Sequence, residues 1–140
     1  MKKILFLILP VVLLAACEKQ YTVGKNVTCV GLEDSSQEKV FCKDSKDKPV
    51  DGSVIQLNEN GKKIREMQMK GGYENGVEKE YYESGKLKVE ANVVDGHPVG
   101  LGKIYYENGQ LQMVLNFDGE DIQIVEVYDE SGTSIKLMEK

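Results

Sequence analysis

The chain has 140 residues, of which 41% are hydrophobic and 29% charged, and it carries a formal net charge of −5. This length suits one small domain. Because the chain is acidic overall and its basic residues are interleaved with acidic ones, nucleic acid and anionic lipid are poor partners by long-range attraction.

The first 16 residues are predicted to be an export signal peptide. A short basic head, Met1 to Lys3, precedes an uncharged apolar run over residues 4–14. The run is too short to cross a bilayer, which takes about 20 apolar residues, and Pro10 interrupts it. Cleavage after this segment leaves 124 residues with a formal charge of about −7.

The signal ends in Leu14-Ala15-Ala16-Cys17, which resembles the lipobox of bacterial lipoproteins. The resemblance implies that Cys17 receives a diacylglycerol and anchors the mature chain in a membrane without a transmembrane helix. Because Glu18 rather than Asp follows the cysteine, the resemblance favours the outer membrane, facing the periplasm, as its place in the cell envelope. A Gram-positive host would keep the protein on its single membrane. Ordinary signal cleavage beside an incidental cysteine is the alternative.

Cys29 and Cys42 remain once Cys17 is assigned to lipid, and they lie 13 positions apart. In an exported protein such an even pair predicts a disulfide, which would stabilise the fold by roughly 3 kcal/mol. Residues 27–30 and 39–42 are predicted to form a short hairpin around it. Free thiols in an anaerobic host and a metal pair are the alternatives. The metal is disfavoured because His97, the only histidine, is far away in the sequence.

The rest of the chain repeats with a period of 24 residues. Three glycine series keep this interval, apart from one step of 23: Gly61, Gly85, Gly109 and Gly132; Gly52, Gly76 and Gly100; and Gly72 and Gly96. The clearest unit, Tyr81 to Leu87, returns as Tyr105 to Leu111, whereas the first and last copies are degenerate. Such a short period is typical of repeat architectures.

Each repeat is predicted to be one β-hairpin. Apolar side chains alternate with polar ones over residues 87–93, and nearly so over 111–117, where Val114 falls among the polar positions. Ser-Gly and Asn-Gly supply the positive φ of a tight turn. Because a lone hairpin is marginal in water, we expect an all-β fold: an elongated antiparallel sheet of successive hairpins. The predicted divisions are a signal peptide (1–16), a lipidated segment with a disulfide-tied hairpin (17–43) and a repeat domain (44–140).

The unit Tyr105-Tyr106-Glu107-Asn108-Gly109-Gln110-Leu111 resembles MORN-type repeats, in the bacterial variant of YwqK-like proteins that are often labelled antitoxins. The resemblance spans roughly residues 44–134 and is strong in the middle two copies. It implies an elongated sheet of hairpins without catalysis, whose surface binds a protein partner. In some members that partner is thought to be a toxin encoded alongside. The implied fold is firmer than the implied function, because a repeat scaffold accommodates many partners.

No catalytic pattern accompanies the repeats. His97 lies in a Gly-Pro loop, and no serine or cysteine motif accompanies it as a catalytic partner. The glycines at 96, 100 and 102 precede a predicted strand, whereas the glycines of a nucleotide-binding loop precede a helix. The run Asp118-Gly119-Glu120-Asp121 lacks the spaced oxygen ligands of a calcium loop. We therefore expect no enzyme activity, no cofactor and no metal site.

Five residues are candidates for partner binding: Tyr82, Tyr106, Glu80, Glu83 and Glu107. The two tyrosines are predicted to form an exposed aromatic ladder of the kind that anchors protein interfaces. Alternatively, they stiffen the hairpins as cross-strand neighbours. The preceding column, Tyr81, Tyr105 and Tyr128, shares the parity of the apolar face and is expected in the core.

The sequence thus predicts a lipid-anchored, non-enzymatic protein that binds a protein partner, for which toxin neutralisation is one hypothesis. The main rival is a structural scaffold or tether of the envelope, including binding to polysaccharide or peptidoglycan. Binding of lipid headgroups ranks lower, because the negative charge opposes contact with anionic lipid.

Overall fold

The computed structural model describes residues 19–34, 37–119 and 121–136. Cys17 and the signal segment lie outside the described residues. The strands are β1 (Gln20–Thr22), β2 (Val27–Asp34), β3 (Gln37–Asp44), β4 (Gly52–Leu57), β5 (Lys63–Lys70), β6 (Tyr73–Glu74), β7 (Gly76–Tyr81), β8 (Leu87–Val94), β9 (His97–Tyr105), β10 (Leu111–Asp118) and β11 (Asp121–Val127). This described part contains no helix, and so none able to span a membrane.

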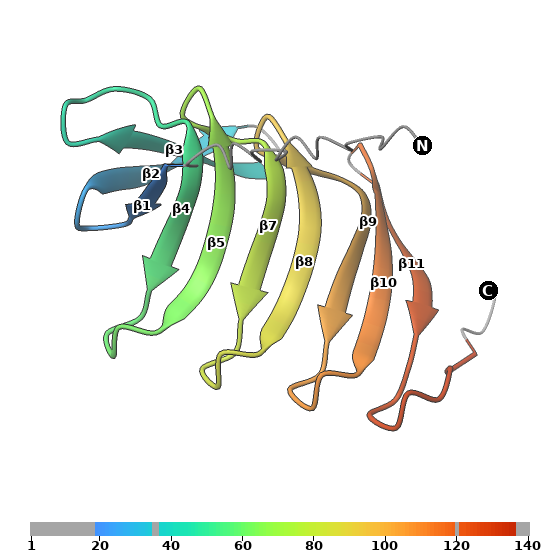
Figure 1. Ribbon diagram of the computed structural model, residues 1–140. Coiled ribbons are helices and arrows are strands. Elements are labelled where there is room, and N and C mark those ends of the chain that lie inside the picture. The colour runs from blue at the N-terminus through green and yellow to red at the C-terminus, as the bar shows by residue number, and fades with distance from the viewer. Residues whose placement is uncertain (1–18, 35–36, 120, 137–140) are drawn as a thin grey trace, which may run out of the picture.

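All eleven strands belong to one sheet, which confirms the predicted all-β fold of successive hairpins. From β4 to β11 the strands follow one another across an elongated, curved sheet (Figure 1). Each neighbouring pair in this series is antiparallel. The exception to the hairpin pattern is β1, which pairs in parallel with β4.

The sheet has two ends that differ in their connections (Figure 1). At the turn end, residues 58–62, 82–86, 106–110 and 129–133 form four similar turns. In each turn the first residue's N–H donates to the fifth residue's carbonyl, and a glycine with φ between 76° and 92° occupies the fourth position. The opposite end, the loop end, carries Asp51–Gly52, Gly71–Gly72, Asp95–Gly96 and Gly119.

Strand β8 follows the predicted alternation, because Ala91 and Val93 are buried while Asn92 and Val94 are exposed. Strand β10 differs. Val114, expected among polar side chains, is only 6% exposed and is the most buried residue of its strand. It pairs with Lys103 on one side and Glu126 on the other, and β10 has a register shift against each neighbour. The methylene stems of such long side chains can cover a valine on a nominally polar face.

The N-terminal hairpin, β2 and β3, lies across the loop end (Figure 1). Cys29 and Cys42 pair opposite each other and form a disulfide. Strand β3 also pairs with β6 through Phe41 and Tyr73, so the hairpin and the repeats share one sheet. The predicted boundary between residues 43 and 44 therefore separates no independent body within the described residues.

Two repeat glycines provide room for this hairpin. A Cβ atom on Gly72 would lie 2.4 Å from the Phe41 ring, and one on Gly96 would lie 3.0 Å from the Lys39 side chain. Both glycines are buried. The column at 72 and 96 thus serves close packing as well as turn formation.

The main hydrophobic core lies under this hairpin rather than in the middle repeats. Its buried members are Val27, Cys42, Val50, Val54, Met67 and Met69. Partly buried Tyr21, Val23, Cys29 and Val40 pack against them. Each large buried side chain of this kind contributes on the order of 1.5–3 kcal/mol. The segment that lacks the 24-residue period therefore supplies much of the core.

Candidate interaction surfaces

The two tyrosines of the predicted aromatic ladder form hydrogen bonds between repeats. Tyr82 and Tyr106 are half-buried, and their hydroxyls donate to main-chain carbonyls of the next repeat. The Tyr82 hydroxyl lies 2.7 Å from the Tyr105 oxygen, and the Tyr106 hydroxyl lies 3.0 Å from the Tyr128 oxygen. These hydrogen bonds agree with the alternative interpretation, in which the tyrosines stiffen the sheet. They join neighbouring repeats, however, rather than the two strands of one hairpin.

The same column contains Asn58 and Asp129 in the outer repeats, and these side chains act within their own turns. The Asn58 side-chain oxygen accepts from the N–H groups of residues 60 and 62, and Asp129 accepts from those of residues 131 and 133. The Ser131 hydroxyl, followed by these N–H groups, lowers the pKa of Asp129. Sequence reasoning treated these copies as degenerate and missed this capping.

The three predicted glutamates differ in their positions and exposure. Glu83 and Glu107 are exposed within the turns, whereas Glu80 is half-buried in β7 and pairs in register with Arg65. The core column is also less buried than expected, since Tyr81, Tyr105 and Tyr128 are all half-buried. The hydroxyl of Tyr81 donates to Glu66, and that of Tyr128 donates to Glu126. Of the five candidates, Glu83 and Glu107 are thus exposed, whereas Glu80, Tyr82 and Tyr106 are half-buried.

A partly buried ionic cluster joins β5, β6 and β7. Arg65 donates to Glu74 at 3.0 Å and also forms an ion pair with Glu78. The Glu74 residue is 5% exposed. Burial raises the pKa of Glu74 from 4.5 to about 7, while Arg65 lowers it and Glu78 raises it further. A carboxyl group that titrates near neutrality in this position links the stability of the sheet to pH.

A second network surrounds Glu66, the neighbour of Arg65 in β5. Its carboxylate accepts hydrogen bonds from Lys63 at 2.7 Å, from the Tyr81 hydroxyl at 3.1 Å and from the Ser53 hydroxyl at 3.3 Å. Lys63, more than Tyr81 and Ser53, lowers the pKa of Glu66, although partial burial opposes this shift. Since every member has a partner, we interpret the network as structural.

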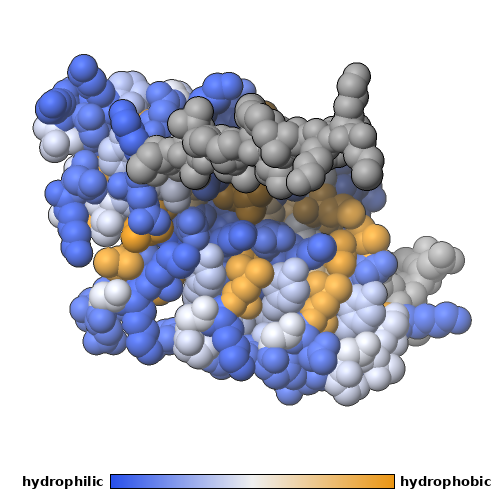
Figure 2. All heavy atoms as spheres, in the orientation of Figure 1, coloured by the Kyte–Doolittle hydropathy of each residue, from blue (hydrophilic) through white to orange (hydrophobic). Residues whose placement is uncertain are grey.

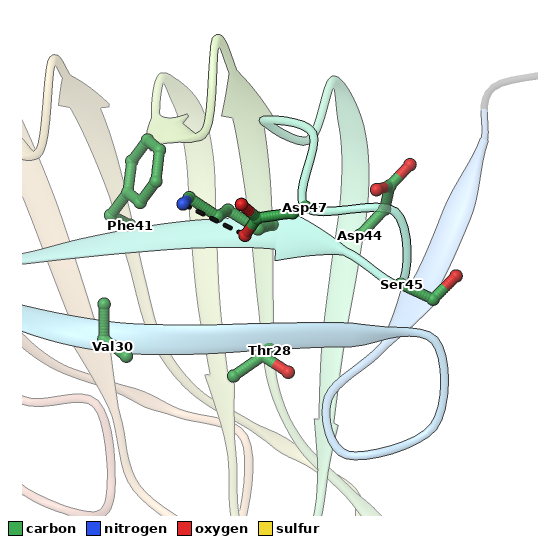
Figure 3. A pocket seen from close by; sticks show the side chains of 7 residues that line it. Thr28, Val30, Phe41, Asp44, Ser45 and Asp47 are labelled. Atoms are coloured by element: carbon green, nitrogen blue, oxygen red, sulfur yellow. Dashed lines mark ion pairs between the residues drawn. The ribbon is translucent and has the colours of Figure 1, made fainter.

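The N-terminal hairpin carries a cavity of about 470 Å³, lined in part by Thr28, Val30, Phe41 and Ser45 (Figure 3). Beside it, Lys43 and Asp47 form an ion pair at 3.1 Å. The Phe41 ring packs against the Tyr73 ring with their centroids 4.9 Å apart. Val30 remains 50% exposed. This arrangement places apolar side chains beside an ion pair, with Asp44 as a further acidic group in the lining.

The C-terminal strand presents three exposed apolar side chains close together. Ile122, Ile124 and Val125 of β11 are 61%, 50% and 47% exposed. Strand β11 pairs with β10 and ends the strand order, so it forms an edge of the sheet. Figure 2 shows that, elsewhere on the visible face, apolar residues occur mainly as narrow stripes between hydrophilic columns. An exposed terminal strand is a natural consequence of an open sheet, and the strand order identifies β11 as such a strand.

The charge of the chain is concentrated beside the same edge. Residues 104–135 contain seven carboxylate side chains and no lysine, arginine or histidine. Asp121 and Glu126 belong to β11 itself, and both are exposed. An edge that is both apolar and acidic is suited to an extended partner segment that carries apolar and basic side chains.

Comparison with known proteins supports the repeat assignment. Residues 74–95 and 98–118 match the MORN repeat variant family. The first match covers the hairpin of β7 and β8, and the second covers that of β9 and β10. The chain therefore contains MORN repeats, units often involved in binding. No curated protein and no solved structure matches the chain.

Proposed function

We propose that this protein is a lipid-anchored, non-enzymatic component of the cell envelope whose MORN repeats bind a protein partner. Support for the anchor comes from the lipobox-like residues that end in Cys17, with the outer membrane as the favoured location. Support for binding comes from the repeat sheet, which offers an extended surface rather than an enclosed site.

The observation that carries the binding proposal is the apolar, acidic edge at β11. Ile122 and Ile124 are exposed on a strand that ends the strand order, within a segment of seven carboxylates and no basic residue. The partner is then a protein with a basic, partly apolar extended segment that adds to this edge by main-chain hydrogen bonds. Because surface charges are screened by salt, complex formation weakens as ionic strength rises.

The finer proposal is that the partner is an exported toxin, as the resemblance to YwqK-like proteins implies. In that case the neighbouring reading frame encodes an exported protein that is harmful when this gene alone is deleted. A deletion that alters envelope integrity in cells without such a neighbour would favour the rival function, a structural scaffold.

The test of the edge is co-purification of the full-length protein from detergent-solubilised envelopes. We expect Ile124→Lys to lose the partner that the wild type retains, because a lysine interrupts the apolar edge and reduces its negative charge. Val77→Lys is the matched control, since Val77 is also exposed but lies in β7, in the middle of the sheet. Equal recovery of the partner by Ile124→Lys and Val77→Lys would rule out the β11 edge.

A further inference from the structure

The chain is attached to the sheet almost as soon as the mature protein begins. Ser53 N–H donates to the Lys19 carbonyl at 3.0 Å, and β1 then pairs with β4 from Gln20 and Ser53 onward. Gly52, with φ of 131°, leaves room for this contact, because a Cβ atom there would lie 2.3 Å from the Lys19 oxygen. Lys19 is therefore held at the start of β4, which belongs to the loop end.

Only Glu18 separates Cys17 from Lys19. Two residues span at most about 7 Å when fully extended. We propose that this short tether holds the loop end of the sheet against the lipid headgroups, so that the repeat strands stand away from the membrane. The inference rests on the proposed lipid anchor at Cys17, and it adds which surface of the protein faces the bilayer.

The chemistry of the loop end is compatible with a lipid surface. The Phe41 ring packs at a tilt against the Tyr73 ring. Exposed Val30 lies beside Phe41 (Figure 3), and the Lys43 ammonium lies 5.9 Å from the centre of the Phe41 ring. Aromatic rings and lysine stems with charged tips are suited to the boundary between headgroups and acyl chains. Residues 43–51 contain three lysines and three aspartates, so this segment has no net charge to repel anionic lipid.

The turn end then faces away from the membrane. Strand β8 has eight residues and spans about 26 Å at the usual rise per residue. The four turns carry exposed glutamates in matching positions, at 59, 83, 107 and 130. This orientation keeps them about a strand length from the headgroups. The β11 edge runs along the side of the sheet, where a partner in the periplasm has access to it.

The orientation can be tested with the full-length lipidated protein in vesicles of phosphatidylethanolamine and phosphatidylglycerol. Single fluorophores are attached through Lys70→Cys at the loop end or Ser84→Cys at the turn end, both exposed positions. Acceptor dyes are carried on the lipid headgroups. We expect more efficient energy transfer from position 70 than from position 84, because position 84 lies about a strand length farther from the headgroups. Equal transfer from both positions in anchored protein would overturn the proposed orientation.

Two controls separate the orientation from the anchor itself. Vesicle flotation of Cys17→Ser tests the anchor: loss of flotation supports it, whereas unchanged flotation would refute the proposed lipoprotein.

A spacer of about twelve glycines and serines between Glu18 and Lys19 gives a root-mean-square reach of about 19 Å. We expect this spacer to reduce the difference between positions 70 and 84. A difference that survives the spacer unchanged would refute the role of the short tether.

Discussion

At the scale of single residues, one column of the repeat uses two different ways to stabilise the turn end. Tyr82 and Tyr106 donate to the main chain of the following repeat, whereas Asn58 and Asp129 accept from N–H groups of their own turns. The tyrosines therefore connect neighbours, while the short polar side chains close local turns. The period of the sequence identified this column of residues. It did not predict that the tyrosine hydroxyls reach the next repeat, because that depends on the twist of the sheet and the spacing of its strands.

We expect Tyr82→Phe and Tyr106→Phe each to lower the free energy of unfolding by about 0.5–1.5 kcal/mol, because each loses one hydrogen bond of its hydroxyl. Urea denaturation followed by circular dichroism measures the change. Tyr73→Phe is the matched control: Tyr73 is exposed, and within the described structure its side chain contacts Phe41 through the ring. Equal stability of all three variants and the wild type would contradict the proposed contact between repeats.

The buried Glu74 predicts a pH dependence of stability. Its pKa is about 7 in the folded protein, compared with 4.5 without burial. The folded state therefore binds more protons than the unfolded state between these values, and the free energy of unfolding falls as pH rises through this window. The slope approaches about 1.4 kcal/mol per pH unit in the middle of the window.

The Glu74→Gln variant tests this dependence, because glutamine keeps the shape of the side chain but does not titrate. Urea unfolding at several pH values between about 5 and 8 is expected to give a flatter profile for the variant than for the wild type. The carboxylates of Glu66, Asp44 and Asp129 have lowered pKa values, so their contribution changes at lower pH. Parallel profiles for the two proteins would show that Glu74 is not the titrating group.

At the scale of elements, the glycine columns illustrate where sequence reasoning succeeds and where it stops. The glycines at 61, 85, 109 and 132 form the predicted turns with positive φ. Gly72 and Gly96 belong to another column, and they also accommodate Phe41 and Lys39 of the N-terminal hairpin. Turn formation depends on neighbouring residues and can be predicted from the sequence. The packing of a glycine against a residue more than 30 positions away cannot be predicted in this way, because no periodic pattern in the sequence marks it.

The two kinds of glycine can be separated by matched substitutions. Gly72 and Gly85 have nearly the same φ, 87° and 84°, but a Cβ on Gly85 meets nothing within 4 Å. Gly85→Ala is therefore expected to cost only the backbone term, about 1–2 kcal/mol. Gly72→Ala adds overlap with the Phe41 ring and should cost about 1–3 kcal/mol more. Thermal or urea unfolding measures both, and equal losses would show that the hairpin does not need this space.

Strand β10 shows a limit of the alternation rule within a single element. The rule correctly assigned the two faces of β8, but it placed Val114 among exposed polar side chains. In the structure Val114 is buried between Lys103 and Glu126, in a strand with register shifts against both neighbours. Alternation predicts the face of the strand on which a side chain lies. The burial of that side chain also depends on the residues opposite it on the adjacent strands, and a β-bulge changes which residues these are.

At the scale of the whole molecule, the succession of hairpins was predictable because each strand from β7 onward pairs with the next strand in sequence. The pairing of β1 with β4 and of β3 with β6 was not predicted, since these contacts join distant segments without a repeat signal. The exposed edge at β11 follows from the same strand order.

Repeat proteins behave approximately as a sum of units and neighbour contacts, so removal of one period should preserve the fold. Deletion of residues 82–105 joins Tyr81 to Tyr106 and recreates the Tyr-Tyr-Glu turn. We expect a folded β protein with a smaller urea m-value, because less surface is exposed on unfolding. Deletion of 82–104 is the control, since one extra residue shifts the register and turns side chains to the other face. Equal stability of the two deletions would contradict the importance of the period.

The position of the hydrophobic core also sets an order for assembly. The core residues lie between Val27 and Met69, in the half of the chain that is synthesised first. This half can bury its apolar side chains before the later repeats exist, and β5 then offers a free edge to β7. Each following strand finds its partner already in place, so unpaired strands are exposed only briefly. Growth of the sheet can therefore proceed strand by strand, from the N-terminal core towards β11.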